Sequence, residues 1–328
     1  MSAPLALVTG ASGFVGSHIV DELLRRGARV RCLLRKTSSR RWLEGKPVEY
    51  AVGDVRGAAG LDDAVRGVDW IVHAAGLTHA RNPAEFHDAN VHGTEHILSA
   101  ALKADPPLRR FVYVSSQAAS GPSHDDRRVE ERHVAEPVSA YGTTKLLGEE
   151  LTMLASSALP VVVIRPPAVY GPRDAAFLKL FQAVKWGVFP VFRRAGRFSL
   201  LYVEDLARAV WLALNDDRAL GQIYFVAEPE AADYEELGAA LMSAMGRRAA
   251  ILRIPAPVLL VAAFLGEAGG ALAGKSPFLS RAKLREITAG DWTVSSAKIR
   301  EQLGWTPGVM LEEGVRRTAE WYRAAGWV

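Results

Sequence analysis

The stretch Thr9-Gly10-Ala11-Ser12-Gly13-Phe14-Val15-Gly16-Ser17-His18 decides the fold, because it joins a short apolar run to a helical pattern. Residues 5–8 have strand character, and apolar side chains recur at helical spacing after the glycines. The three glycines allow a tight turn, let backbone approach a pyrophosphate, and point a helix N-terminus at an anion. The pattern predicts a nucleotide site at Gly10, Ser12, Gly13, Phe14, Val15 and Gly16. An ordinary strand-to-helix turn is the alternative.

Length and composition exclude several classes of protein. The chain has 328 residues, 49% of them hydrophobic, which is enough for one large domain or two unequal ones. The single cysteine, Cys32, excludes an intramolecular disulfide and suits a reducing compartment. The net charge is only +4 and the arginines occur singly or in short pairs, which argues against nucleic-acid binding. The first apolar run is too short for a signal peptide, so we expect a cytoplasmic protein.

Strand-like and helix-like segments alternate along much of the chain. Further strands are expected at 29–35, 48–54, 70–75, 111–116 and 161–165, with another at 222–226 that rejoins the sheet. Helices are expected at 89–103 and 141–155. This order predicts an α/β fold with a doubly wound parallel Rossmann sheet and a smaller, mostly helical C-terminal lobe. We expect a dinucleotide-binding domain at 1–172, rejoined by 200–228, and a substrate-binding lobe at 173–199 and 229–328.

An unusual apolar stretch lies at residues 254–272 of the expected lobe. Its unbroken run, residues 258–265, is shorter than the ~18–20 residues that a bilayer span needs, and Glu267 follows it. Three interpretations stay open: a buried helix, a lid over an apolar substrate, or a surface that dips into a membrane. The last two both imply a hydrophobic ligand.

The residues at two strand ends bear on the cofactor. Asp54 follows the third strand, where its carboxylate can accept a hydrogen bond from an adenine amino group or cap a helix. The second strand ends in Arg35 and Lys36, at the place where an acidic residue would bind the ribose of NAD. Arginine can hold a 2′-phosphate through two N–H groups, whereas a solvated loop is the alternative. The strand end therefore favours NADP over NAD.

Tyr141 and Lys145 stand one helical turn apart on the same expected helix face. A free tyrosine has a pKa near ~10, and an adjacent ammonium is expected to lower it towards the working range of an acid/base. Ser115 and Ser116 end a parallel strand, where open α/β sheets place their sites. The arrangement indicates proton transfer at a hydroxyl or carbonyl oxygen, with Ser116 donating a hydrogen bond to that oxygen. A plain surface contact is the alternative for the Tyr141 and Lys145 pair.

These segments resemble the extended short-chain dehydrogenases/reductases of the epimerase/dehydratase superfamily, over nearly the whole chain. The motifs that carry the resemblance are the glycine turn, Gly53-Asp54-Val55, His73-Ala74-Ala75-Gly76, Asn90-Val91-His92-Gly93-Thr94, Val114-Ser115-Ser116, the Tyr141 and Lys145 pair, and Arg165-Pro166-Pro167-Ala168-Val169-Tyr170-Gly171-Pro172.

The resemblance implies a role for each motif. Tyr141 is implied as the acid/base, Lys145 also as a ligand of the nicotinamide ribose, and Ser116 rather than Ser115 as the catalytic serine. The choice of Ser116 follows from its distance to Ala119-Ser120-Gly121. The implied cofactor site, which includes no metal ion, also contains Val55, Ala74, Ala75, Gly76, Asn90, Pro166, Ala168 and Val169.

One departure from the family's pattern and two similarities to particular members narrow the branch of the family. Nucleotide-sugar enzymes usually carry an arginine where this chain has Phe198, although Arg197, Arg194 and Arg285 could compensate. The tail from 276 to 307 is similar to 3β-hydroxysteroid and sterol dehydrogenases, and the strand end at Arg35 resembles dihydroflavonol reductases.

We therefore expect an NADP-preferring alcohol dehydrogenase or ketone reductase that acts on a bulky apolar substrate. The alternatives are a nucleotide-sugar epimerase or reductase with tightly bound NAD, and a catalytically silent nucleotide-sensing or scaffold protein of the same fold. A homodimer and a peripheral membrane contact through 254–272 are the partners compatible with the sequence.

Overall fold

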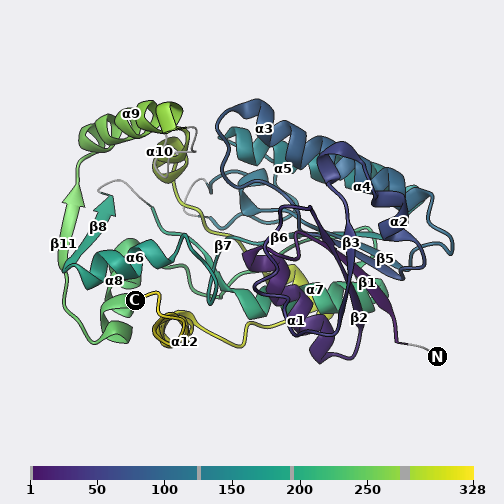
Figure 1. Cartoon of the computed structure of the whole chain (residues 1–328). Helices are drawn as coiled ribbons and strands as arrows, with labels where there is room; N and C mark the ends of the chain where they lie inside the picture. The colour runs from purple at the N-terminus through teal and green to yellow at the C-terminus, as the bar shows by residue number, and fades with distance from the viewer. Residues whose placement is uncertain (1–2, 124–126, 193–195, 274–280) are drawn as a thin grey trace.

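The computed structural model describes residues 3–123, 127–192, 196–273 and 281–328. A parallel sheet of seven strands forms its centre, in the order β10-β6-β5-β4-β1-β2-β3 (Figure 1). The strands are β1 (Leu5–Thr9), β2 (Arg29–Leu34), β3 (Val48–Val52), β4 (Trp70–His73), β5 (Arg110–Val114), β6 (Val161–Arg165) and β10 (Ile223–Phe225). The doubly wound Rossmann sheet expected from the alternating pattern is confirmed.

Helices cover both faces of this sheet (Figure 1). One layer contains α2 (Leu61–Val65), α3 (Pro83–His87), α4 (Gly93–Leu102) and α5 (Ala140–Leu154), and the opposite layer contains α1 (Phe14–Arg25) and α7 (Val203–Asn215). The strands β1, β4, β5 and β6 are buried at every position, as their nearly unbroken apolar sequences require in a sheet covered on both sides. The expected helix at 89–103 differs at its start, because residues Asp88–His92 form a single π-helical turn before α4.

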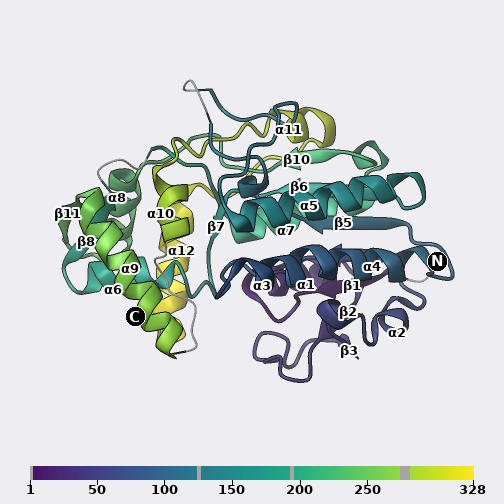
Figure 2. The same ribbon diagram turned by 90° about the horizontal axis from the view of Figure 1, so that it is seen from above.

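A second group of elements lies beyond the carboxyl ends of the strands (Figure 2). It contains α6 (Leu178–Lys185), β8 (Val188–Phe192), α8 (Tyr234–Met245), β11 (Ala250–Ile254), α9 (Ala256–Ala273), α10 (Arg281–Thr288) and α12 (Leu311–Ala324). The strands β8 and β11 pair with each other, and β7 (Ala168–Tyr170) pairs with β9 (Leu200–Tyr202). Among the residues described, no helix has both the length and the apolar character needed to cross a membrane.

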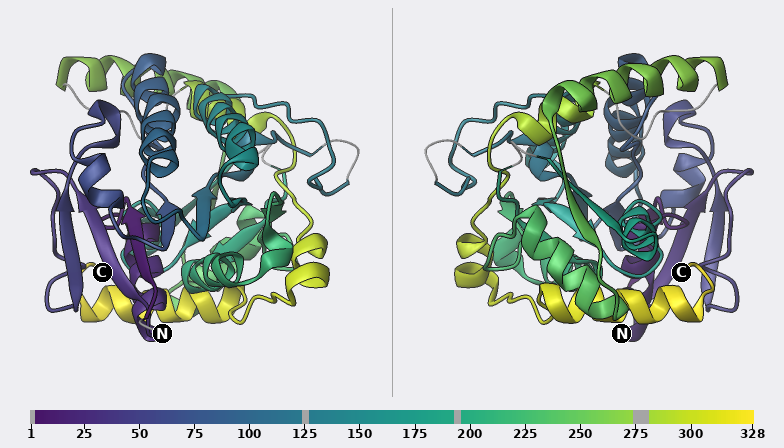
Figure 3. Two further views of the ribbon diagram at one scale, coloured as in Figure 1. Left: turned by 90° about the vertical axis from the view of Figure 1, so that its right-hand side faces the viewer. Right: turned by 90° about the vertical axis from the view of Figure 1, so that its left-hand side faces the viewer.

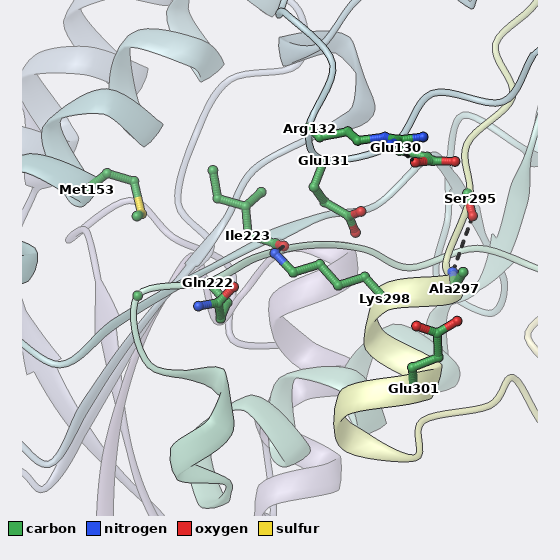
Figure 4. Close-up of a pocket in the computed structure, with 11 residues that line it drawn as sticks. Glu130, Glu131, Arg132, Met153, Gln222, Ile223, Ser295, Ala297, Lys298 and Glu301 are labelled. Carbon is green, nitrogen blue, oxygen red and sulfur yellow. Dashed lines mark hydrogen bonds and ion pairs between the residues drawn. The ribbon is translucent and has the colours of Figure 1, made fainter.

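The edge strand β10 is covered by two side chains (Figure 4). Glu131 accepts a hydrogen bond from the Phe225 N–H at 2.8 Å, and Lys298 at the start of α11 (Ala297–Leu303) donates to the Ile223 carbonyl at 3.0 Å. These residues line a cavity of about 620 Å³ on the outer side of the strand. Since both contacts use backbone groups that a free edge would offer to another chain, they protect the sheet from edge-to-edge pairing.

The C-terminal segment is fastened to α7 by one buried carboxylate. Asp205 is 1% exposed, and its Oδ2 accepts hydrogen bonds from the N–H groups of Gly308 and Val309, both at 3.0 Å. The Asp205 carbonyl accepts a further bond from the Trp305 indole at 3.2 Å, and the carboxylate pairs with Arg208. This cluster fixes the chain between α11 and α12 against the face of α7.

Replacing Asp205 with alanine is expected to lower the free energy of unfolding by about 3 kcal/mol, because two buried N–H groups and a cation lose their acceptor. The melting temperature should fall by roughly 5–10 °C in a calorimetric scan. The matched control is Asp63→Ala on α2, whose carboxylate forms an exposed pair with Arg66 and should change the melting temperature little. Equal melting temperatures for the two variants would contradict the role of Asp205.

Candidate active site

The predicted glycine turn has the backbone geometry of an anion site. It lies between β1 and α1, and Gly10 adopts a φ of +70°. A Cβ at Gly10 would lie 2.7 Å from the Ala74 carbonyl oxygen, and a Cβ at Gly16 would lie 2.2 Å from the Gly10 carbonyl oxygen. No side chain caps Gly13, the N-cap of α1, and the first turn of α1 has no acidic residue. The free N–H groups of α1 therefore fit a dinucleotide pyrophosphate.

A buried histidine ties this turn to the neighbouring strand, a role that the sequence analysis missed. The His73 Nδ1 lies 2.7 Å from the Thr9 hydroxyl, which accepts a hydrogen bond from the Ala75 N–H at 3.1 Å. The other ring nitrogen of His73 lies 3.2 Å from the Thr94 hydroxyl. Burial lowers the pKa of His73 to about 3, so the ring is neutral and holds the ends of β1 and β4 together.

The predicted adenosine-side residues stand next to the glycine turn. Ala74, Ala75 and Gly76 directly follow β4, and Asn90 in the π-helical turn holds this loop. The Asn90 amide accepts a hydrogen bond from the Leu77 N–H at 2.8 Å and donates to the Leu77 carbonyl at 3.1 Å and the Thr144 hydroxyl at 3.1 Å. Asn90 therefore joins the loop after β4 to α5, while its contact with a cofactor stays a prediction.

The structure brings the three predicted catalytic residues together. Ser139 caps α5, accepting a hydrogen bond from the Gly142 N–H at 3.1 Å, and so fixes the helix start that carries Tyr141. The Ser116 hydroxyl lies near the Tyr141 phenol, whose pKa it lowers. One turn further along α5, the Lys145 ammonium donates to the Val114 carbonyl at 2.8 Å, directly before the two serines. Hydroxyl, phenol and ammonium therefore meet at the carboxyl end of β5.

The two serines have different surroundings. The Ser115 hydroxyl donates to the carboxylate of Glu149, which is buried and forms an ion pair with Arg165 at 2.6 Å. Ser116 faces Tyr141, and its hydroxyl accepts a hydrogen bond from the Ala118 N–H at 3.1 Å. Ser115 thus engages the carboxylate of the buried ion pair, whereas Ser116 is the serine near Tyr141. The sequence analysis missed the role of Glu149, although its position four residues after Lys145 is the signal that could have found it.

The phenol of Tyr141 is protonated at neutral pH, whereas the sequence predicted that the ammonium of Lys145 lowers its pKa. Burial is the largest cause that raises the pKa of Tyr141 to about 12, and the negative charge of Glu286 also raises it. Hydrogen bonding with Ser116 lowers the same pKa and so acts in the opposite direction. Burial also lowers the pKa of Lys145 to about 7, with Glu149 opposing. The Lys145 ammonium points to the Val114 carbonyl, and Lys145 is not among the groups that lower the pKa of Tyr141. Tyr141 is therefore prepared to donate a proton.

Elements from both parts of the chain border Tyr141. Phe86 on α3 places its ring centroid 5.9 Å from that of Tyr141. From the other side comes Glu286 on α10, a buried carboxylate that pairs with Lys283 at 2.7 Å. Figures 1 and 2 show α10 between α9 and the helices α3 and α5. Tyr141 therefore lies where α10 faces the sheet domain.

The expected nicotinamide-side residues lie close to the serines. The Pro166 carbonyl accepts a hydrogen bond from the Gln117 N–H at 2.8 Å, which holds the end of β6 beside the Ser116 loop. Ala168 and Val169 follow in β7, where Ala168 is exposed. Their contact with a nicotinamide stays a prediction.

The two strand ends that bear on the cofactor have different environments. Asp54 accepts a hydrogen bond from the Arg56 N–H at 3.0 Å and forms an ion pair with its guanidinium, so the capping alternative describes its present contacts. The next residue, Val55, is buried. Arg35 and Lys36 are exposed directly after β2. Arg40 stacks on Tyr50, with its guanidinium 4.6 Å from the ring centroid, which leaves Arg35 and Lys36 as the cations at the strand end.

The place where nucleotide-sugar enzymes carry an arginine is apolar. The Phe198 ring packs on Tyr234, with centroids 5.0 Å apart. Arg197 donates to the Ala231 carbonyl and forms an ion pair with Glu236, so its guanidinium already has acceptors. Arg285 is exposed on α10, and Arg194 lies outside the described residues.

Comparison with known proteins gives a consistent family. A profile of the NAD dependent epimerase/dehydratase family matches residues 6–227. The chain is 32% identical to a ceramide reductase of Caulobacter vibrioides over 98% of this chain and 95% of the relative. It is 26% identical to a decarboxylating sterol-4-alpha-carboxylate 3-dehydrogenase of Saccharomyces cerevisiae, over 96% and 97%. The crystal structure of a Thermus thermophilus UDP-glucose 4-epimerase with NAD superimposes with a TM-score of 0.79, at 26% identity over 98% and 99%.

Replacing Tyr141 with phenylalanine is expected to reduce turnover by roughly 10²–10⁴-fold, because the proton donor is removed. Circular dichroism and cofactor affinity should stay near the wild-type values, since the ring and its packing are kept. The control is Tyr50→Phe, whose hydroxyl contacts the Leu43 carbonyl away from the site and should leave turnover unchanged. A Tyr141→Phe variant with most of the wild-type kcat would rule out this assignment.

Proposed function

Since the chain belongs to the NAD dependent epimerase/dehydratase family, and is an enzyme of the extended short-chain dehydrogenase/reductase type, we propose that it interconverts a ketone and a secondary alcohol on a bulky apolar substrate. The observation that carries the proposal is the meeting of Ser116, Tyr141 and Lys145 at the carboxyl end of β5. The protonated phenol of Tyr141 favours the reductive direction, in which a carbonyl oxygen takes up a proton.

Each residue of this set has a chemical task in ketone reduction. The Ser116 hydroxyl donates a hydrogen bond to the substrate carbonyl and so orients it towards Tyr141. Tyr141 gives its proton to the oxygen as negative charge develops there. Lys145, one turn along α5 and held by the Val114 carbonyl, would bind the nicotinamide ribose. A bound nicotinamide supplies the hydride, and the turn at Gly10, Gly13 and Gly16 would hold its pyrophosphate.

The surroundings of the site favour an apolar substrate over a nucleotide sugar. Phe86 borders Tyr141, and the aromatic pair of Phe198 and Tyr234 occupies the place of the diphosphate-binding arginine. A diphosphate there would lose its hydration without an equivalent partner. The reductase and dehydrogenase relatives are named for ceramide and a sterol, which are both bulky and apolar.

Two other functions remain as alternatives. A nucleotide-sugar epimerase is supported by the likeness to the UDP-glucose 4-epimerase, and it would hold NAD through turnover. A silent nucleotide-sensing protein is disfavoured, because such a protein has no need for all three of Ser116, Tyr141 and Lys145. Purified protein that carries bound NAD and epimerises a nucleotide sugar would support the first alternative and overturn the proposed branch.

The substrate proposal predicts turnover with a steroid or a long-chain β-keto or β-hydroxy compound, and none with UDP- or TDP-sugars. Burial of apolar ligand surface contributes about 25 cal/mol per Å², whereas an unpaired diphosphate costs binding energy. The measurement is consumption of the reduced cofactor in a panel of steroid, sphingoid-base, flavonoid and nucleotide-sugar carbonyls. Absence of turnover with every apolar carbonyl, together with reaction of a nucleotide sugar, would contradict it.

The cofactor is proposed to be NADP rather than NAD, because Arg35 and Lys36 stand where the 2′-phosphate of the adenosine ribose would lie. Replacing Arg35 with alanine should weaken NADP binding by roughly ten- to a hundredfold, while NAD binding changes little. Fluorescence titration of both cofactors provides the measurement. The control is Arg66→Ala, an exposed arginine paired with Asp63. Equal losses for NADP and NAD, or a wild-type preference for NAD, would disprove the role of Arg35.

A further inference from the structure

The helix α9 presents an apolar stripe to solvent. Val258, Leu260, Val261 and Phe264 are 55%, 51%, 60% and 59% exposed, while Leu259 and Ala263 are buried at 5% and 0%. At 100° per residue, the exposed four occupy one side of the helix and the buried two the other. The buried-helix interpretation is therefore wrong for the outer side of α9.

This stripe stands at the rim of the molecule. Figures 1 and 3 show α9 along an outer edge, at the same level as the layer that contains α4 and α5. In the described part of the segment from 255 to 266, every residue is apolar or glycine. Exposing such a stripe to water is unfavourable by about 25 cal/mol per Å², so a surface of this kind is normally covered.

The chain around α9 carries a strong positive charge. Between residues 246 and 285 there are seven lysines or arginines and one acidic residue, which gives a net charge of +6. The whole chain carries only +4, so the rest is slightly acidic. Arg281, Lys283 and Arg285 are exposed on α10, the helix that packs against α9, and Lys283 pairs with Glu286. Arg248 is separated from α9 by the whole of β11. An apolar stripe beside the cations of α10 matches the acyl chains and anionic headgroups of a lipid surface.

We propose that the outer side of α9 docks on an anionic lipid bilayer, with Val258, Val261 and Phe264 inserted at the headgroup boundary. The inference goes beyond the proposed function and does not depend on it. The helix lies along the surface, because its apolar run of residues 258–265 is far shorter than the ~20 residues of a span.

A second copy of this chain fits the same surface less well. Two copies meeting through α9 would bring two segments of net charge +6 together, and like charges repel. Four exposed side chains on one helix are also few for a stable dimer, which buries about 800 Å² on each partner. An anionic bilayer avoids the charge repulsion, since its headgroups supply the opposite charge.

Docking would bring the candidate active site close to the lipid. α9 packs on α10, whose Glu286 acts on the phenol of Tyr141. α9 therefore presents its outer side to the proposed membrane surface and packs against α10, the helix whose Glu286 raises the pKa of Tyr141. A lipid-soluble substrate could reach this site from the bilayer without passing through bulk water.

The test is sedimentation of the full-length protein with vesicles of phosphatidylcholine alone and of phosphatidylcholine mixed with phosphatidylglycerol. The wild type is expected to bind the mixed vesicles, and raised salt should weaken the binding because it screens the cations. The double variant Val261→Ser, Phe264→Ser should bind at least about tenfold more weakly, since it removes the two most exposed side chains of the stripe. Both side chains are mostly exposed, so thermal stability should stay near the wild-type value.

The matched control is Leu102→Ser with Leu154→Ser, two leucines 52% and 77% exposed at the ends of α4 and α5, and it should bind like the wild type. Vesicle binding that the α9 variant leaves unchanged, or no binding by the wild type, would overturn the proposal. So would a wild-type dimer that the α9 variant dissociates, because a second copy would then cover the stripe. A raised KM for an apolar substrate in vesicle-free solution would indicate a lid instead. Vesicle binding is measured without turnover, so this test can fail while the proposed function holds.

Discussion

The candidate site depends on one constraint, the parallel alignment of neighbouring strands. Because β6, β5, β4 and β1 are adjacent and parallel, their carboxyl ends meet at one edge of the sheet. The four segments that follow them contain Pro166, Ser116, Ala74 and Gly10. A serine hydroxyl and the glycine turn, from distant parts of the chain, therefore lie at the same edge of the sheet. α5 then needs only to cross this edge to place Tyr141 against Ser116.

Burial shifts the pKa values of Tyr141, Lys145 and His73 at this edge, and a charged group buried there needs a partner. Lys145 loses most of its hydration, and an isolated buried ammonium would give up its proton. Glu149, one turn along α5, counteracts that loss, and Arg165 and Ser115 satisfy the Glu149 carboxylate in turn. The charge on Lys145 is thus supported by the carboxylate of a buried ion pair. His73 needs no charged partner, because burial keeps its ring neutral while the ring joins the ends of β1 and β4.

Much of the fold followed from local sequence, whereas the site's electrostatics did not. The buried strands were predictable since β5 and β6 are apolar at nearly every position, and the glycine turn since only glycine tolerates the close contacts at Gly10 and Gly16. The pKa of Tyr141 was not predictable, because the burial of its phenol and the approach of Glu286 depend on how α10 packs. Of the three interpretations left open for residues 254–272, the buried helix is wrong for the outer side of α9 for a similar reason. A helix that is apolar on all sides is typical of a core, and the sequence does not show that only one side of α9 meets α10.

α10 lies between α9, which carries the exposed apolar stripe, and the surroundings of Tyr141. Its Glu286 forms an ion pair with Lys283 while its charge reaches Tyr141, so a shift of α10 changes the electrostatic environment of the catalytic phenol. Lys283 and Lys179, from α10 and α6, also lower the pKa of His79 in the loop after β4, although partial burial is the larger cause. Charged groups of α10 and α6 therefore lie near the loop after β4, which begins with the predicted cofactor residues Ala74, Ala75 and Gly76. Because α9 packs on α10, the outer surface of α9 and the surroundings of Tyr141 are joined through one intervening helix.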